Sequence, residues 1–210
     1  RPRANGIIAL GLREDDRLIR VTLTDGNSQM LVASYNGKVV RFPEDTVRPM
    51  GRTATGVRAI KLDEDGKDRV IGMICVEQGS KDSVLVISEK GFGKRTLLDD
   101  ENGEPIYRIT NRGGKGVKTM NITDKTGNLI GLEAVNDDMD LMLITKAGTA
   151  IRMAMDAISV LGRATQGVKL IELQKRNDTL MFGCTVPKEE QEEVAESEEV
   201  TTEETTTTEE

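Results

Sequence analysis

Short apolar segments alternate with polar turns along most of the chain, and their order repeats about every fifty residues. In each round a segment of alternating polarity comes first, and an apolar strand follows a polar turn. A nearly continuous apolar run then ends in a hydroxyl residue, at 30–34, 84–88 and 141–145. A glycine stands three residues after that hydroxyl each time and begins a fourth strand. The pattern predicts antiparallel strands and at most one short helical turn, within 153–161.

A glycine-rich basic phrase opens each round. It reads GRTATGVRAIKL at 51–62, NRGGKGVKTMNI at 111–122 and GRATQGVKLIEL at 162–173, and its second half also occurs at 5–12. We call Gly56, Gly116 and Gly167 the anchor glycines, and the five residues before each of them an anchor loop. Four strands per repeat at this period are typical of propellers. The sequence predicts an all-β, propeller-like partial ring, with repeats over 6–55, 56–115 and 116–166 and a last half over 167–186.

The acidic residues are concentrated at one end of the sequence. Of the 29 basic and 36 acidic residues, segment 187–210 holds one lysine and eleven glutamates, so 1–186 carries a net charge of about +3. Segment 187–210 lacks the apolar area that would offset its chain entropy. We therefore expect a basic domain of about three and a half blades over 1–186 and a disordered acidic tail over 187–210.

Composition argues against several kinds of chemistry. The chain has no histidine, and no carboxylate pair, Ser-His set or metal cluster recurs with usable spacing. Aromatic residues are too few for base stacking to be the main mode of binding. Cys75 and Cys184 lie in apolar segments and are interpreted as free buried thiols of a cytoplasmic protein. No apolar run approaches membrane-spanning length. A catalytic or metal site is not predicted.

Basic residues fall into three columns when the repeats are aligned. They stand four residues after the hairpin glycine, four before the anchor glycine and two after it: Arg41, Arg95 and Arg152; Arg52, Arg112 and Arg163; Arg58, Lys118 and Lys169. A single arginine of this kind is most simply a solvated residue on an edge strand. Columns in a ring of blades instead form a basic belt on the rim. Such a belt suits the phosphates of a curved duplex DNA, bound without sequence reading.

The second anchor loop adds to this hypothesis. Arg112-Gly113-Gly114-Lys115-Gly116 combines two cations with glycines that let the backbone approach a ligand closely. It lacks the spacing of a nucleotide-binding P-loop. Lys115 therefore joins the candidate DNA contacts, and so does Lys94, which precedes an arginine of the first column.

These motifs resemble a known family. The anchor phrases, GKVVRF at 37–42, GFGKRT at 91–96 and the acidic tail are similar to the C-terminal domain of the bacterial DNA gyrase A protein, over essentially 1–186. The resemblance implies a β-pinwheel, a propeller variant in which blades exchange a strand, with about six blades in the full ring. It also implies that DNA wraps around the basic rim in a positive superhelical sense and directs the enzyme toward negative supercoiling.

The resemblance also bears on individual residues and partners. The family's box reads Gln-Arg-Arg-Gly-Gly-Lys-Gly. Thr110 and Asn111 replace its first two residues here, and Arg112 and Lys115 correspond to phosphate contacts. No cofactor is implied for this chain. In the parent enzyme, ATP and Mg act through a partner, the gyrase B protein, in an A2B2 assembly. Tyr35 and Tyr107 lie outside any context that matches the catalytic tyrosine.

Two other functions stay open. The equivalent domain of topoisomerase IV shares the blades but usually degenerates the box. A protein-binding propeller would expose an aromatic or apolar patch on one face instead of columns of arginine. The acidic tail is either a solubilising extension or a segment that occupies the basic rim when DNA is absent.

Overall fold

A computed structural model describes residues 4–64, 66–173 and 177–188 of the chain. Regular structure in this part consists of strands and two single 3-10 turns. The elements are β1 Gln29–Ser34, β2 Lys38–Pro43, η1 Glu44–Thr46, β3 Val70–Val76, β4 Ser83–Ser88, β5 Phe92–Leu97, β6 Val117–Lys118, β7 Leu129–Val135, β8 Met139–Thr145, β9 Ala150–Ala154, η2 Met155–Ala157, β10 Val168–Lys169 and β11 Leu180–Pro187. The one helical turn expected within 153–161 is η2, and η1 takes the same place after the first hairpin.

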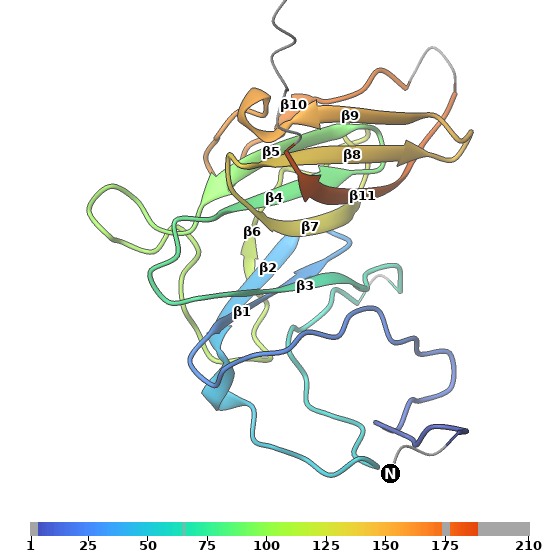
Figure 1. Ribbon diagram of the computed structural model, residues 1–210, viewed down its shortest axis with the longest axis vertical. Helices are drawn as coiled ribbons and strands as arrows, with labels where there is room; N and C mark the ends of the chain where they lie inside the picture. The colour runs from blue at the N-terminus through green and yellow to red at the C-terminus, as the bar shows by residue number, and fades with distance from the viewer. Residues whose placement is uncertain (1–3, 65, 174–176, 189–210) are drawn as a thin grey trace, which may run out of the picture.

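The strands form three antiparallel sheets (Figure 1). Their strand orders are β3-β1-β2-β6, β10-β5-β4-β7 and β11-β8-β9. Figure 1 shows the sheets stacked along the long axis of the molecule, from the β1–β2 hairpin to the β8–β9 hairpin at the top. The apolar runs recognised in the sequence are the central strands β1, β4 and β8. Every residue of β1 and β4 is buried because sheets or loops cover both faces.

Each sheet draws strands from more than one repeat. The hairpin β1–β2 comes from the first repeat, β3 from the second and β6 from the third. Strand β6 adds to β2 with Val39 opposite Val117, and β10 adds to β5 with Gly93 opposite Val168. The all-β pinwheel with exchanged strands is confirmed. The repeat boundaries at 55/56 and 115/116 therefore fall inside sheets and not between them.

Two anchor glycines make this exchange sterically possible. Gly116 and Gly167 have φ of +73° and +79°, and a Cβ built on either lies 2.6 Å from a carbonyl oxygen of the accepting hairpin, that of Val39 or Gly93. Such a contact is not tolerated, so only glycine lets the added strand approach. Gly56 has a φ of +85°, but its Cβ meets nothing within 4 Å. The repeated glycine therefore has two packing environments.

This difference predicts unequal effects of alanine. Gly116→Ala combines backbone strain with a backbone clash, whereas Gly56→Ala adds only the strain, about 1–2 kcal/mol. We expect Gly116→Ala to lower the free energy of unfolding by at least about 2 kcal/mol more than Gly56→Ala, which is its matched control. Urea titration followed by circular dichroism measures both. Equal losses would show that β6 does not dock as described.

Two expected strands do not form. Residues 57–62 make only an isolated parallel bridge, Ile60 to Gly114, and Leu18–Ile19 lies in an irregular segment. The reason is the absence of a partner: the matching segments β6 and β3 pair with hairpins of earlier repeats, and the described residues contain no hairpin before β1. Several apolar side chains of 7–23 are accordingly exposed, including Leu23 at 98%.

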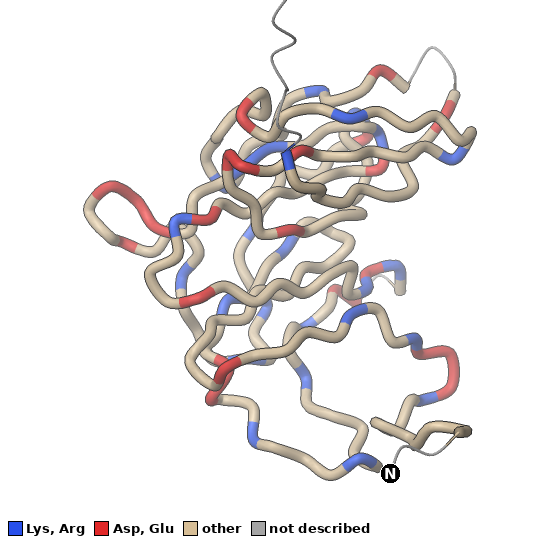
Figure 2. The backbone as a smooth tube through the Cα atoms, in the orientation of Figure 1, with Lys and Arg blue, Asp and Glu red and all other residues tan. Residues whose placement is uncertain are grey.

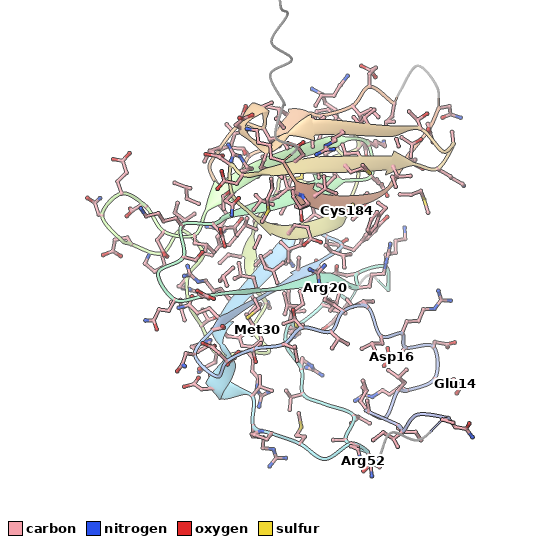
Figure 3. All side chains as sticks on the ribbon, viewed as in Figure 1. Glu14, Asp16, Arg20, Met30, Arg52 and Cys184 are labelled. Atoms are coloured by element: carbon pink, nitrogen blue, oxygen red, sulfur yellow. The ribbon has the colours of Figure 1, made fainter. Side chains whose placement is uncertain are left out.

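Both cysteines are free thiols, as expected, but they are half-buried on β3 and β11 instead of buried; Cys184 is labelled in Figure 3. The longer second repeat holds an inserted turn, in which Asp99 bridges Pro105 and the Gly103 amide donates to Asp100. The acidic tail, apart from Pro187 and Lys188, lies outside the described residues.

Candidate nucleic-acid interface

The first arginine column is mostly internal. Arg41 is 4% exposed. Its Nε donates to Gln29 Oε1 at 2.5 Å and its Nη1 to Asp99 Oδ1 at 2.8 Å. The same Nη1 also donates to the carbonyl oxygens of Leu98 and Tyr107, at 3.1 and 3.3 Å. Because Asp99 belongs to the loop after β5, this guanidinium ties the first sheet to the second.

Arg95 does the same one blade further on. It is 8% exposed, donates to the carbonyl oxygen of Ile158 at 2.9 Å and pairs with Asp137. Arg152 pairs within its own hairpin, with Asp140 at 2.8 Å, and donates to the carbonyl oxygen of Pro187. The expectation of an outward belt is wrong for Arg41 and Arg95, which are buried, whereas Arg152 is exposed and its DNA contact stays a prediction. A guanidinium with several fixed acceptors is a structural link between strands and loops.

Lys94 is also internal, contrary to expectation. Its side chain is fully buried, and its Nζ donates to the carbonyl oxygens of Gly162 and Arg163, at 2.5 and 2.6 Å. Burial lowers the pKa of Lys94 to about 8, and the positive charge of Arg163 acts in the same direction. Lys94 therefore supports an anchor loop from beneath and does not face solvent.

The two columns that flank the anchor glycines come together because successive anchor segments, 51–62, 111–122 and 162–173, contact one another. The Gly113 amide donates to the Ala59 carbonyl at 2.6 Å, and the Lys61 amide donates to Gly114 at 2.8 Å. One repeat later, the Asn121 amide donates to Thr165 at 3.0 Å. The three anchor segments thus lie side by side in chain order. Basic residues of three repeats are therefore carried on one line of adjoining segments.

We call this line the anchor track. Its members are Arg58, Lys61, Arg112, Lys115, Lys118, Arg163 and Lys169. Arg112 and Arg163 are half-buried and the others are exposed. Arg163 Nη1 donates to the carbonyl oxygen of Lys118 at 2.7 Å, and Arg112 Nε donates to Thr46 at 3.2 Å. Arg52, the remaining candidate, lies on the loop at the lower end of Figure 3, next to the track's first segment. DNA contact by these residues stays a prediction.

Two basic residues of this surface were not predicted from the sequence. Arg108 lines a hollow of about 470 Å³ with Arg112, Lys115 and the glycines between them, over a floor of Val39 and Val40. Lys61 lines a smaller hollow with Lys115. Lys61 was missed because the matching position in the later repeats holds Asn121 and Glu172, so its charge does not recur. Arg108 was missed because the matching position, eight residues before the anchor glycine, holds Arg48 in one repeat and Ser159 in the next. The one sequence signal for either residue is the positive charge of the residues around it.

Carboxylates are less frequent along the track than cations. Glu172 pairs with Lys169 at 2.5 Å, and Glu64 lies 3.9 Å from Lys61. Figure 2 shows acidic residues on the projecting loop around 99–104, which holds Asp99, Asp100, Glu101 and Glu104. An excess of exposed cations, with glycines that admit close approach, is chemistry suited to phosphate.

The described residues contain neither a metal-binding cluster nor a membrane-spanning helix. Within the described ranges, His, Cys, Asp and Glu nowhere gather in a group of three that would hold a metal ion. Within the same residues, none of the helical segments has the length and hydropathy needed to cross a bilayer.

Comparison with known proteins identifies the class. The family model described as "DNA gyrase C-terminal domain, beta-propeller" matches residues 1–25, 29–77, 82–136 and 140–182. The DNA gyrase A proteins of Staphylococcus aureus strains MRSA252 and NCTC 8325 are each 48% identical over 169 residues. That match covers 80% of this chain and 18% of each relative, so the chain spans under a fifth of their length.

Solved structures support the fold. A C-terminal domain of DNA topoisomerase IV matches with a TM-score of 0.76 at 20% identity, covering 85% of this chain and 53% of that one. A DNA gyrase A C-terminal domain matches with a TM-score of 0.73 at 23% identity, covering 86% and 58%. At these identities the likeness is one of fold. The class is a β-pinwheel with propeller-like blades.

The particular family follows from the sequence matches. The chain belongs to the DNA gyrase A C-terminal domain family. The 48% identity to the gyrase A proteins favours this family over the topoisomerase IV alternative.

Proposed function

We propose that this domain is a non-catalytic module that binds the backbone of duplex DNA along the anchor track and wraps it around the pinwheel. The single observation that carries the proposal is the direct contact between successive anchor segments, which joins basic residues of three repeats into one line. Phosphate contacts position a protein on DNA without reading its sequence. A track built from lysine, arginine and glycine suits that task.

The length of the track matters for wrapping. Smoothly bending a site of 20–30 base pairs costs about 1–6 kcal/mol. One anchor loop contributes too few contacts to offset that cost, whereas cations from three loops act together along the curved surface. Wrapping therefore needs several consecutive repeats.

We further propose that the longer protein is an ATP-dependent type II topoisomerase, DNA gyrase. The identity to the gyrase A protein supports this. ATP and Mg would act through the gyrase B protein in an A2B2 assembly, and this module would need no cofactor of its own. Residues 1–186 would form the pinwheel and 187–210 an acidic extension. A protein-binding role is the second candidate, favoured by the exposed apolar side chains of 7–23.

A topology assay tests the wrapping. A nicked circular DNA is sealed by ligase with increasing amounts of the 210-residue chain, and the linking number is read after the protein is removed. We expect the distribution to shift in the positive sense in proportion to bound protein, and to return to that of free DNA at high salt. An unshifted distribution at saturation would refute wrapping and leave simple binding.

A further inference from the structure

Lys94 holds an unusual place among the cations of this domain. It is fully buried on β5, and within the described residues no carboxylate is among the groups that shift its pKa. Its ammonium instead donates to two carbonyl oxygens of the third anchor loop, those of Gly162 and Arg163. A buried charge that has only neutral acceptors carries a desolvation cost, so its presence calls for an explanation.

The matching place in the first hairpin differs. Three residues after the hairpin glycine stands Val40 in the first sheet and Lys94 in the second. Val40 is buried in the floor of the hollow of about 470 Å³ beside residues 110–116. A lysine under the third loop reaches the loop backbone, whereas a valine under the second leaves a hollow. The two anchor loops thus have different supports.

Further hydrogen bonds hold the third anchor loop in place. Thr96 Oγ1 donates to the Leu161 carbonyl at 2.9 Å, and Thr165 Oγ1 donates to Gly162 at 2.9 Å. From this loop Arg163 reaches β6, where its Nη1 donates to the Lys118 carbonyl at 2.7 Å. Holding the loop backbone therefore also sets where the guanidinium of Arg163 stands relative to Lys118.

We propose that Lys94 is a positioning residue whose buried ammonium clamps the anchor loop 162–166 and holds Arg163 and Lys118 together as a pair for one backbone phosphate. The DNA part of this inference rests on the proposed function. The clamp also places a third positive charge behind the pair. A phosphate bound there interacts favourably with the protonated form of Lys94.

This arrangement couples DNA binding to protonation, and the sign is defined. Because the pKa of Lys94 is lowered to about 8, the free domain loses this proton as the pH rises above 8. A bound phosphate favours the charged amine, so binding above pH 8 takes up a proton and the affinity falls with rising pH. Two other titratable groups matter here: Arg163, whose charge acts on Lys94, and Tyr107, on which the same arginine also acts. Burial raises the pKa of Tyr107 above its ordinary value, so this phenol does not titrate in the same interval.

The clamp is tested first without DNA. Hydrogen exchange of the Asn121 and Thr165 amides, which donate to the loop carbonyls of Thr165 and Gly162, reports loop opening. Lys94→Met removes both clamp hydrogen bonds, and we expect exchange at these amides to be at least about tenfold faster. Lys81→Met, at an exposed site between β3 and β4, is the matched control and should change nothing. Unchanged exchange in a folded Lys94→Met chain would overturn the clamp.

The coupling is tested by affinity for a random-sequence duplex at constant ionic strength. We expect wild-type affinity to fall about tenfold between pH 8 and pH 9.5, with little change in Lys94→Met. A structural role alone would not give this pH profile. A wild-type affinity that does not change with pH would overturn the pairing with phosphate. This outcome does not depend on whether the variant folds. If the wild-type chain bound no DNA, the proposed function would fail, while hydrogen exchange would still decide the clamp.

Discussion

Replacing Lys118 and Lys169 together by glutamine is expected to weaken binding to duplex DNA by at least about tenfold at low salt. Both side chains are exposed, on the exchanged strands β6 and β10. Their removal deletes two cations from the middle and the end of the anchor track, and Lys169 also gives up its ion pair with Glu172 and its contact with the Phe92 ring. Each lost phosphate contact removes its share of counterion release, which dominates binding of this kind. Fluorescence anisotropy with a labelled duplex measures the change.

The matched control removes the same charge elsewhere. Lys81 and Lys146 are exposed in the turns after β3 and β8, outside the anchor segments. Lys81→Gln with Lys146→Gln keeps the net charge equal to that of the track variant, so any long-range effect of net charge is shared. We expect a change of less than about threefold. Equal losses in the two double variants would mean that charge, and not the track, governs affinity.

Arg41→Met is expected to have the largest effect on stability. The substitution removes a buried guanidinium that links β2 to Gln29, Asp99 and two carbonyls of the next blade. Those acceptors lose their donor, and breaking such a pair from one side typically costs about 3–5 kcal/mol. The free energy of unfolding, from urea titration, should fall by that amount.

The exposed Arg48 provides the comparison. Arg48→Met removes the same side chain from the loop after η1 and should change stability by less than about 0.5 kcal/mol. The folded fraction of Arg41→Met should retain the salt dependence of wild-type DNA binding, because Arg41 is outside the track. A marginal loss of stability with a sharp loss of DNA binding would reverse these assignments.

Much of the fold could be predicted because the same strand and turn residues recur in each repeat. A hydroxyl, then a glycine three residues later, marks the hairpins that became β1–β2, β4–β5 and β8–β9. The pairing between blades is less visible, because the strands that join a hairpin come from later repeats. Residues 57–62 have the pattern of β6, but a strand also requires a partner edge, and the sequence does not state which edge is present.

The arginine column shows why a recurring charge is ambiguous. A repeated internal contact and a repeated ligand contact both place the same residue at the same position in every copy. Arg41 and Arg95 recur because each blade is tied to the next, whereas Lys118 and Lys169 recur on exposed strands. Burial separates the two cases. For Arg41 it depends on an acceptor 58 residues away, Asp99, which no local pattern indicates.

The salt dependence of duplex binding tests the central claim most directly, because it counts phosphates neutralised along the track. The slope of log affinity against log salt should be about −0.9 for each phosphate contacted. For the Lys118→Gln, Lys169→Gln variant, we expect this slope to be less negative than that of the wild type by about 1.8, and the Lys81→Gln, Lys146→Gln control to match the wild type. A wild-type slope near zero, or identical slopes in all three proteins, would contradict the account.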